Sequence, residues 1–121
     1  MIELNIETFR EYCLAKPGVT EELPFGEDTL VFKVLGKMFA LTSLDDEQFH
    51  INLKCEPEKA IQLREMYACV QPGYHMNKQH WNTVSVDGSV PPREVYQWID
   101  DSYQLVAAKL TRAQKVTLGL E

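Results

Sequence analysis

Three consecutive runs of β-forming residues in the first half of the chain constrain its fold most strongly. Residues 29–35 and 38–44 are rich in β-branched and aromatic side chains, and Gly36-Lys37 between them is a two-residue hairpin signal. Because glycine is the first residue of that pair, we expect a type II′ turn. Residues 49–54 then alternate strictly between apolar and polar side chains, which is typical of a strand with one buried face. Together the runs predict an antiparallel meander with one solvated face.

Helical patterns flank these strands. Residues 5–16 predict a helix that Asn5 caps and that Pro17-Gly18 ends. A second helix is expected to begin at Pro57, because proline is favoured at the first helical position.

A short strand over residues 82–86 and a long helix opened by Pro91-Pro92 complete the pattern. The apolar stripe of this helix recurs at three-and-four spacing and consists of Val95, Trp98, Ile99, Ser102, Leu105, Val106 and Leu110. The order of elements predicts an α+β fold, a two-layer sandwich in which helices cover one face of an antiparallel sheet.

Length and composition fit one soluble domain. The 121 residues are 45% hydrophobic and 25% charged, and we expect a single domain over residues 1–121 with a loose tail at 112–121. No apolar run is long enough to span a membrane, and the N-terminus is acidic where a signal peptide is basic, so we expect a cytoplasmic protein. Three widely spaced cysteines without a CxxC pair indicate neither a disulfide framework nor a zinc ribbon.

The net charge of −6 is unevenly distributed. Residues 1–28 hold seven acids and two bases, whereas residues 29–44 and 66–86 contain no acid. An acidic protein is a poor general binder of polyanions, but a local neutral-to-basic face can still bind one.

The least ordinary segment is PGYHMNKQHW, residues 72–81. As a metal site it is incomplete, because His75 and His80 lie five residues apart and no carboxylate falls inside the segment. We therefore expect no metal and no cofactor.

Nucleophilic or acid–base chemistry is also poorly supported. Cys69 lies between two small apolar residues, which favours a buried, inert thiol. Asp100 and Asp101 are adjacent on the last helix, so they are expected to point in different directions as solvated carboxylates. We therefore expect a protein without enzymatic activity.

Five blocks resemble the MmcQ/YjbR-like family and cover nearly the whole chain. They are PGVTEELPFG (17–26), FKVLGKMFAL (32–41), INLKCEP (51–57), PGYHMNKQHWNTV (72–84) and DSYQLV (101–106). The resemblance implies a bacterial protein with a two-layer α/β sandwich likened to type III secretion chaperones. It also implies DNA binding, the label often given to members of this family.

Two functions remain open at this point. The first is binding of double-stranded DNA, weak and salt-sensitive, by a monomer. The second is binding of a protein or small ligand through the loop at 72–81, with no role for nucleic acid. The contact residues expected for DNA are Lys33, Lys37, Lys54, His75, Asn77, Lys78 and His80. A protein or small ligand would contact the same loop together with Tyr74 and Trp81. DNA binding requires the lysines to share a face away from the acids of the N-terminal region, among them Glu21 and Glu22.

Overall fold

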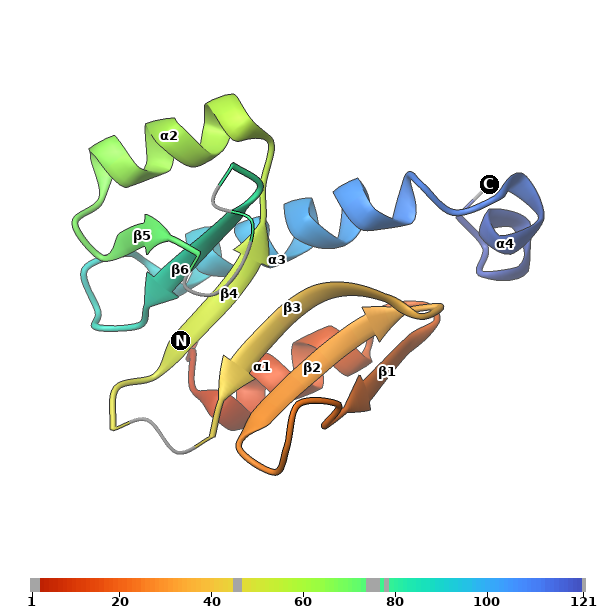
Figure 1. Cartoon of the computed structure of the whole chain (residues 1–121), viewed down its shortest axis with the longest axis horizontal. Coiled ribbons are helices and arrows are strands. Elements are labelled where there is room, and N and C mark those ends of the chain that lie inside the picture. Colours follow the sequence, from red (N-terminus) through yellow and green to blue (C-terminus); the bar gives the residue numbers. More distant parts are fainter. Residues whose placement is uncertain (1–2, 45–46, 74–76, 78, 121) are drawn as a thin grey trace.

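The computed structural model describes residues 3–44, 47–73, 77 and 79–120. Within this part of the chain, four helices accompany a six-stranded sheet whose strand order is β1-β2-β3-β4-β6-β5, with every pair antiparallel (Figure 1). The elements are α1 (Ile6–Leu14), β1 (Val19–Glu22), β2 (Thr29–Val34), β3 (Lys37–Ser43), β4 (His50–Lys54), α2 (Pro57–Met66), β5 (Val70–Pro72), β6 (Trp81–Ser85), α3 (Pro92–Ala107) and α4 (Arg112–Thr117).

The first helix begins as the sequence predicts. The side chain of Asn5 accepts a hydrogen bond from the backbone N–H of Thr8, and the hydroxyl of Thr8 accepts one from the backbone N–H of Asn5. This reciprocal capping box satisfies two backbone donors that a helix start leaves unpaired. Phe9 and Cys13, four residues apart, then form the buried face of α1.

The turn between β2 and β3 differs from the expected type II′ hairpin. Lys37 pairs with Val34, so the two turn residues are Leu35 and Gly36, and both have positive φ, 45° and 85°. Positive φ at both central residues is the pattern of a type I′ turn. The prediction was wrong because it placed Lys37 in the turn, whereas Lys37 is the first residue of β3.

A bulge in β3 places two consecutive residues against the core. Lys33 pairs with Met38 and Phe32 pairs with Ala40, so Phe39 is an extra residue on β3. Phe39 and Ala40 are both fully buried, and both belong to the hydrophobic core that the helices cover. The ring of Phe39 packs edge-on against Tyr103 of α3, and the bulge thus anchors this helix to the sheet.

The helices cover one face of the sheet. Phe32, Ala40, Leu53 and Asn82 are successive cross-strand partners, so their side chains point to the same side. Phe32 at one end of this row contacts Phe9 of α1 at 5.3 Å between ring centroids. Asn82 at the other end donates to the carbonyl of residue 60 in α2. The α+β sandwich expected from the sequence is confirmed.

Helix α3 lies where the sheet divides. Figure 1 shows β3 and β4 diverging toward the end of the molecule at which α3 emerges. Ser102 is fully buried there: its hydroxyl accepts from the backbone N–H of Lys54 at 2.8 Å and donates to the carbonyl of Phe39. One small hydroxyl thus pairs backbone groups of two strands that no longer pair with each other.

Three elements were not predicted from the sequence, namely β1, β5 and α4. Helix α4 lies within the segment expected as a tail, and a capping box between Thr111 and Gln114 starts it. Leu118 packs directly over Gly18, where an added Cβ would come within 2.7 Å of the leucine side chain. The end of the chain therefore contacts the turn between α1 and β1.

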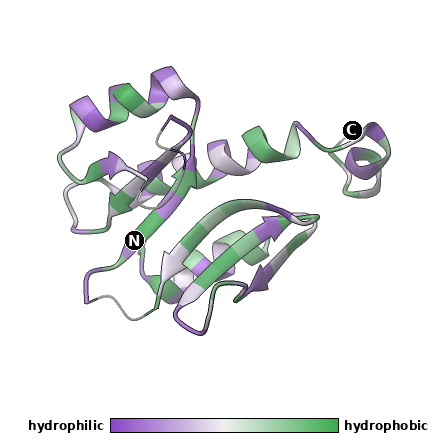
Figure 2. Cartoon of the chain, viewed as in Figure 1, coloured by the Kyte–Doolittle hydropathy of each residue, from purple (hydrophilic) through white to green (hydrophobic). Residues whose placement is uncertain are grey.

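Hydrophobicity follows this architecture. Figure 2 shows hydrophobic residues concentrated along β2, whereas α2 alternates between hydrophilic and hydrophobic residues. Among the helices of the described residues, we find none with the length and apolar character that crossing a membrane would require.

Candidate functional site

Three lysines from different parts of the chain form a basic cluster, which we define as Lys37, Lys54 and Lys109. Lys37 begins β3, Lys54 ends β4, and Lys109 follows α3. The pKa of Lys54 is lowered, first by burial and then by the positive charges of Lys109 and Lys37. The ammonium groups of Lys109 and Lys37 therefore each lie within electrostatic range of Lys54. Among the described residues, none of the three forms an ion pair.

The cluster is a consequence of the divided sheet. Pairing between β3 and β4 ends at Ala40 and Leu53, one residue before Lys54. The hydrogen bonds of Ser102 fix α3 in the gap beyond this point, and two further turns of that helix lead to Lys109. A gap in strand pairing filled by a helix therefore brings together residues far apart in sequence.

Lys109 was missed by the sequence analysis, although the sequence contains a signal for it. Residues 102–120 contain no acidic residue and carry Lys109, Arg112 and Lys115. The fold places this stretch beside the β2–β3 hairpin: the carbonyl of Gly18 accepts from the backbone N–H of Leu35, and Gly18 also contacts Leu118. The acid-free C-terminal stretch and the hairpin thus share one end of the molecule.

Lys33 lies apart from the basic cluster. Its ammonium group is 3.3 Å from a carboxylate oxygen of Glu22 on the neighbouring strand β1. The same strand carries Glu21, which pairs with Arg10 of α1. The requirement that the lysines share a face away from these acids therefore fails for Lys33, whereas Lys37 and Lys54 form no ion pair with these glutamates.

The loop at 72–81 is described only in part. Tyr74, His75 and Lys78 lie outside the described residues. The side chain of Asn77 is exposed and accepts from the backbone N–H of Gln79 at 2.9 Å. Its carbonyl accepts from the backbone N–H groups of His80 and Trp81 at 3.1 and 3.0 Å, so Asn77 organises a turn.

His80 and Trp81 connect this loop to the sheet. The carbonyl of His80 accepts from the backbone N–H of Cys55 at 2.7 Å, and the side chain of His80 is half-buried. Trp81 is only 7% exposed. Because it pairs with Lys54 and alternates with Asn82, its side chain lies on the sheet face opposite α2.

Gly73 explains why the motif needs glycine before the loop. Its backbone N–H donates to the carbonyl of Trp81 at 2.7 Å, and a Cβ at this position would lie 2.7 Å from the Cβ of Trp81. The two backbones are therefore too close for any side chain. Within the segment 72–81, Gly73 and Trp81 thus form a backbone contact where the ends of β5 and β6 meet.

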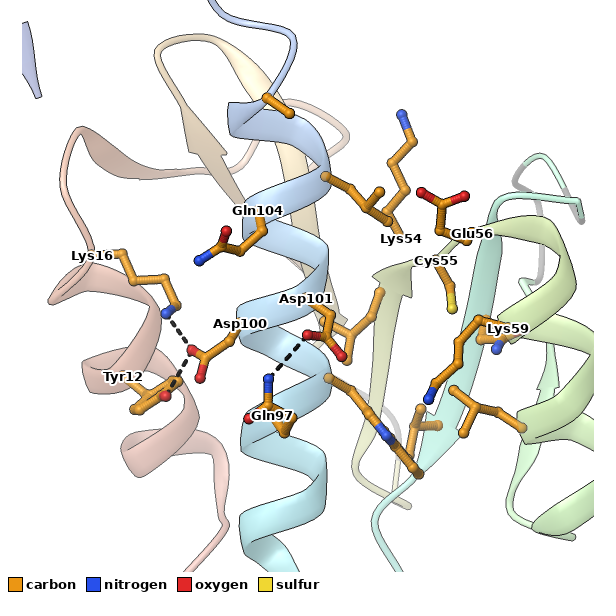
Figure 3. A pocket seen from close by; sticks show the side chains of 17 residues that line it. Tyr12, Lys16, Lys54, Cys55, Glu56, Lys59, Gln97, Asp100, Asp101 and Gln104 are labelled. Carbon is orange, nitrogen blue, oxygen red and sulfur yellow. Dashed lines mark hydrogen bonds and ion pairs between the residues drawn. The ribbon is translucent and has the colours of Figure 1, made fainter. Parts of the chain in front are cut away.

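A groove of about 900 Å³ lies over the sheet next to the basic cluster (Figure 3). Its principal walls are α2 and α3, and its apolar lining is Leu53, Leu63, Val84, Trp98 and Leu105. The charged residues that line it are Lys16, Lys54, Lys59, Glu56, Asp100 and Asp101. Lys54 belongs both to this groove and to the basic cluster.

The two adjacent aspartates of α3 point in different directions, as expected, but Asp100 is not a solvated carboxylate. It accepts a hydrogen bond from the hydroxyl of Tyr12 at 2.7 Å and pairs with Lys16 (Figure 3). Burial, followed by this hydrogen bond, raises the pKa of Tyr12 to about 12. These contacts join α1 to α3, so the charge of Asp100 has a structural role.

The thiols are poor nucleophiles in this environment. Cys13 and Cys69 are buried, and burial raises the pKa of Cys13 to about 12. Cys55 lines the groove, and burial raises its pKa as well. The described residues contain no group of three or more His, Cys, Asp or Glu side chains arranged to hold a metal ion.

Comparison with known proteins gives consistent matches. The YjbR family model matches residues 14–105. The uncharacterized protein YjbR of Escherichia coli K12 is 36% identical over 101 residues, covering 84% of this chain and 86% of that protein. The uncharacterized protein YbdF of E. coli O157:H7 is 37% identical over 106 residues, covering 88% and 87%.

A solved structure matches closely. The crystal structure of Deinococcus radiodurans protein DR2400, which carries the family domain DUF419, has a TM-score of 0.90 and 39% identity. The alignment covers 97% of this chain and 89% of that one.

Proposed function

This chain belongs to the YjbR family, and we propose that it is a DNA-binding protein without enzymatic activity. The proposal places it in the bacterial cytoplasm as a monomer. The observation that carries it is the basic cluster of Lys37, Lys54 and Lys109, three ammonium groups without an ion-pair partner among the described residues.

Electrostatics favours an anionic partner for this cluster. Burial and then repulsion from Lys109 and Lys37 lower the pKa of Lys54, and a phosphate backbone relieves that repulsion. Since lysine contacts phosphate as a point charge, the cluster supplies affinity and not sequence preference.

The overall acidity of the protein is compatible with this proposal because the acids of β1 are paired and one stretch of the chain lacks acids. Glu21 and Glu22 are engaged with Arg10 and Lys33 around β1, whereas residues 102–120 are free of acids. A local field of one sign can bind a polyanion even when the net charge is opposite. Arg112 and Lys115 lie on α4 at the same end and add to that field.

The absence of catalysis is part of the proposal and has physical support. The raised pKa values of Cys13 and Cys55 keep these thiols protonated at neutral pH. Asp100 is engaged with Tyr12 and Lys16, so it is a poor candidate for a general base.

Titration of a fluorescent duplex at two salt concentrations tests the proposal. Three phosphate contacts predict a slope of about −2.7 when the logarithm of the association constant is plotted against that of the salt concentration. Raising the salt concentration from about 50 to about 200 mM should therefore weaken binding roughly 40-fold. A single-stranded oligonucleotide of equal length serves as the comparison. Absence of binding to either at the lower salt concentration contradicts the proposal.

A further inference from the structure

The section of the groove between α2 and α3 has an apolar floor and opposite charges on its two walls. Leu63, Val84, Trp98 and Leu105 supply apolar surface. Both Lys59 of α2 and Asp101 of α3 line this section. Figure 3 shows Lys59 extending from α2 into the space between the helices, with Cys55 beside it, and Asp101 on α3 with its carboxylate next to Gln97.

Lys59 and Asp101 do not neutralise each other directly. They form no ion pair, and the carboxylate of Asp101 instead accepts a hydrogen bond from Gln97 at 3.0 Å. Both charges nevertheless act on the thiol of Cys55, Lys59 lowering its pKa and Asp101 raising it. An ammonium of α2 and a carboxylate of α3 thus line the same groove, and both lie within electrostatic range of Cys55.

The charge balance of the groove selects the class of ligand. Its lining contains three lysines, at positions 16, 54 and 59, and three carboxylates, at 56, 100 and 101. A ligand with one sign of charge would meet as much repulsion as attraction, whereas a ligand with both signs is complementary. Because the floor is apolar, the uncharged part of the ligand must be apolar too.

We propose that this section of the groove binds a free amino acid with a large apolar side chain. Lys59 binds the α-carboxylate, Asp101 binds the α-ammonium group, and the side chain packs on Leu63, Val84 and Trp98. This site is separate from the phosphate contacts proposed for Lys37 and Lys109, since neither residue lines the groove.

The two tryptophans provide a probe and an internal control in one NMR spectrum. Trp98 lines the groove, whereas Trp81 lies on the opposite face of the sheet. Titration of 15N-labelled protein with L-phenylalanine should shift the indole N–H signal of Trp98 and leave that of Trp81 in place. A ligand of this size with modest efficiency gives a dissociation constant of about 1 mM or tighter.

Three analogues test which groups are recognised. N-acetyl-L-phenylalanine lacks the ammonium group, L-phenylalaninamide lacks the carboxylate, and glycine lacks the apolar side chain. Each should bind at least about tenfold more weakly than L-phenylalanine, because each leaves one feature of the site unmatched.

Two surface variants test the residues. Asp101→Asn and Lys59→Gln should each weaken binding of L-phenylalanine by at least about tenfold. Glu11→Gln and Arg93→Gln, which each remove one charge outside the groove, should leave it unchanged. All four positions are partly or fully exposed, so melting temperatures should remain close to that of the native protein.

Three results would overturn the proposal. The first is the absence of a saturable Trp98 shift up to roughly 10 mM L-phenylalanine, about ten times the expected dissociation constant. The second is equal binding of L-phenylalanine and its two blocked derivatives. The third is unchanged affinity in both Asp101→Asn and Lys59→Gln.

Discussion

At the scale of single residues, the segment PGYHMNKQHW carries a structural constraint as well as its polar side chains. Gly73 and Trp81 bring two backbones into contact, and Asn77 holds the turn between them. Glycine is needed at position 73 whether or not the loop contacts a partner.

Replacing Gly73 with alanine should destabilise the protein by about 1–3 kcal/mol, the usual cost of overpacking. The added Cβ would meet the Cβ and carbonyl oxygen of Trp81 at 2.7 and 3.0 Å, and strand backbone cannot move aside cheaply. Urea denaturation measures the change. Gln71→Ala, at an exposed position on β5, the strand that precedes Gly73, is the control and should stay within about 0.5 kcal/mol. Equal stability of the two variants would disprove this close contact.

Two neighbouring residues of α1 predict sensitivity to alkali. Burial raises the pKa of Cys13 from 9.0 and that of Tyr12 from 10.0, each to about 12. The unfolded chain therefore loses these protons at lower pH than the folded one. Their contribution to stability is complete below pH 9 and disappears between pH 9 and 12.

Urea midpoints between pH 8 and 11 measure this loss. In Cys13→Ala the decline should begin nearer pH 10, because the thiol no longer contributes, although the starting stability is lower. Lys54 has the opposite effect on stability. Its pKa is lowered in the folded protein, so the free energy of unfolding rises as increasing pH removes the proton from Lys54. A native midpoint that stays constant or rises from pH 9 to 11 would contradict this account.

At the scale of elements, strands with a strict alternation of apolar and polar residues were predicted correctly from the sequence. In β4, Ile51 and Leu53 are buried and the polar residues between them are half-buried, as strict alternation predicts. Strands β1 and β5 carry weaker signals: β1 is a short edge strand ending in two glutamates, and β5 has three residues including a proline. Tertiary pairing with β2 and β6, and not local propensity, defines them.

The β2–β3 hairpin offers a test of the turn geometry. Leu35 has a positive φ of 45°, which costs a residue with a Cβ about 1–2 kcal/mol. Leu35→Asn creates an Asn-Gly pair, the preferred sequence for a type I′ turn, and should stabilise the protein by about 1 kcal/mol. The side chain of Leu35 is 40% exposed, so the loss of packing is small.

Thermal denaturation followed by circular dichroism measures this gain. Leu44→Asn, a similarly exposed leucine in a segment without positive φ, is the matched control and should give no stabilisation. A lower melting temperature for Leu35→Asn than for the control would argue against the turn type.

At the scale of the whole molecule, the proposal of DNA binding depends on where the described lysines without ion-pair partners lie. Glu21 and Glu22 pair with Arg10 and Lys33 around α1 and β1, while the basic cluster lies where β3, β4 and the end of α3 meet. Lys37 and Lys54 were predicted from sequence as contact residues. Lys109 was not, because its proximity to them depends on α3 filling the gap between two strands through Ser102.

The most direct test of the account compares two variants in the duplex titration. Lys37→Gln/Lys54→Gln/Lys109→Gln removes the basic cluster, whereas Lys33→Gln removes one lysine that already pairs with Glu22. The account predicts that the triple variant reduces the steepness of the salt dependence by about 2.7, and that Lys33→Gln leaves it unchanged. An unchanged slope in the triple variant, with native-like melting, would contradict DNA binding through this cluster.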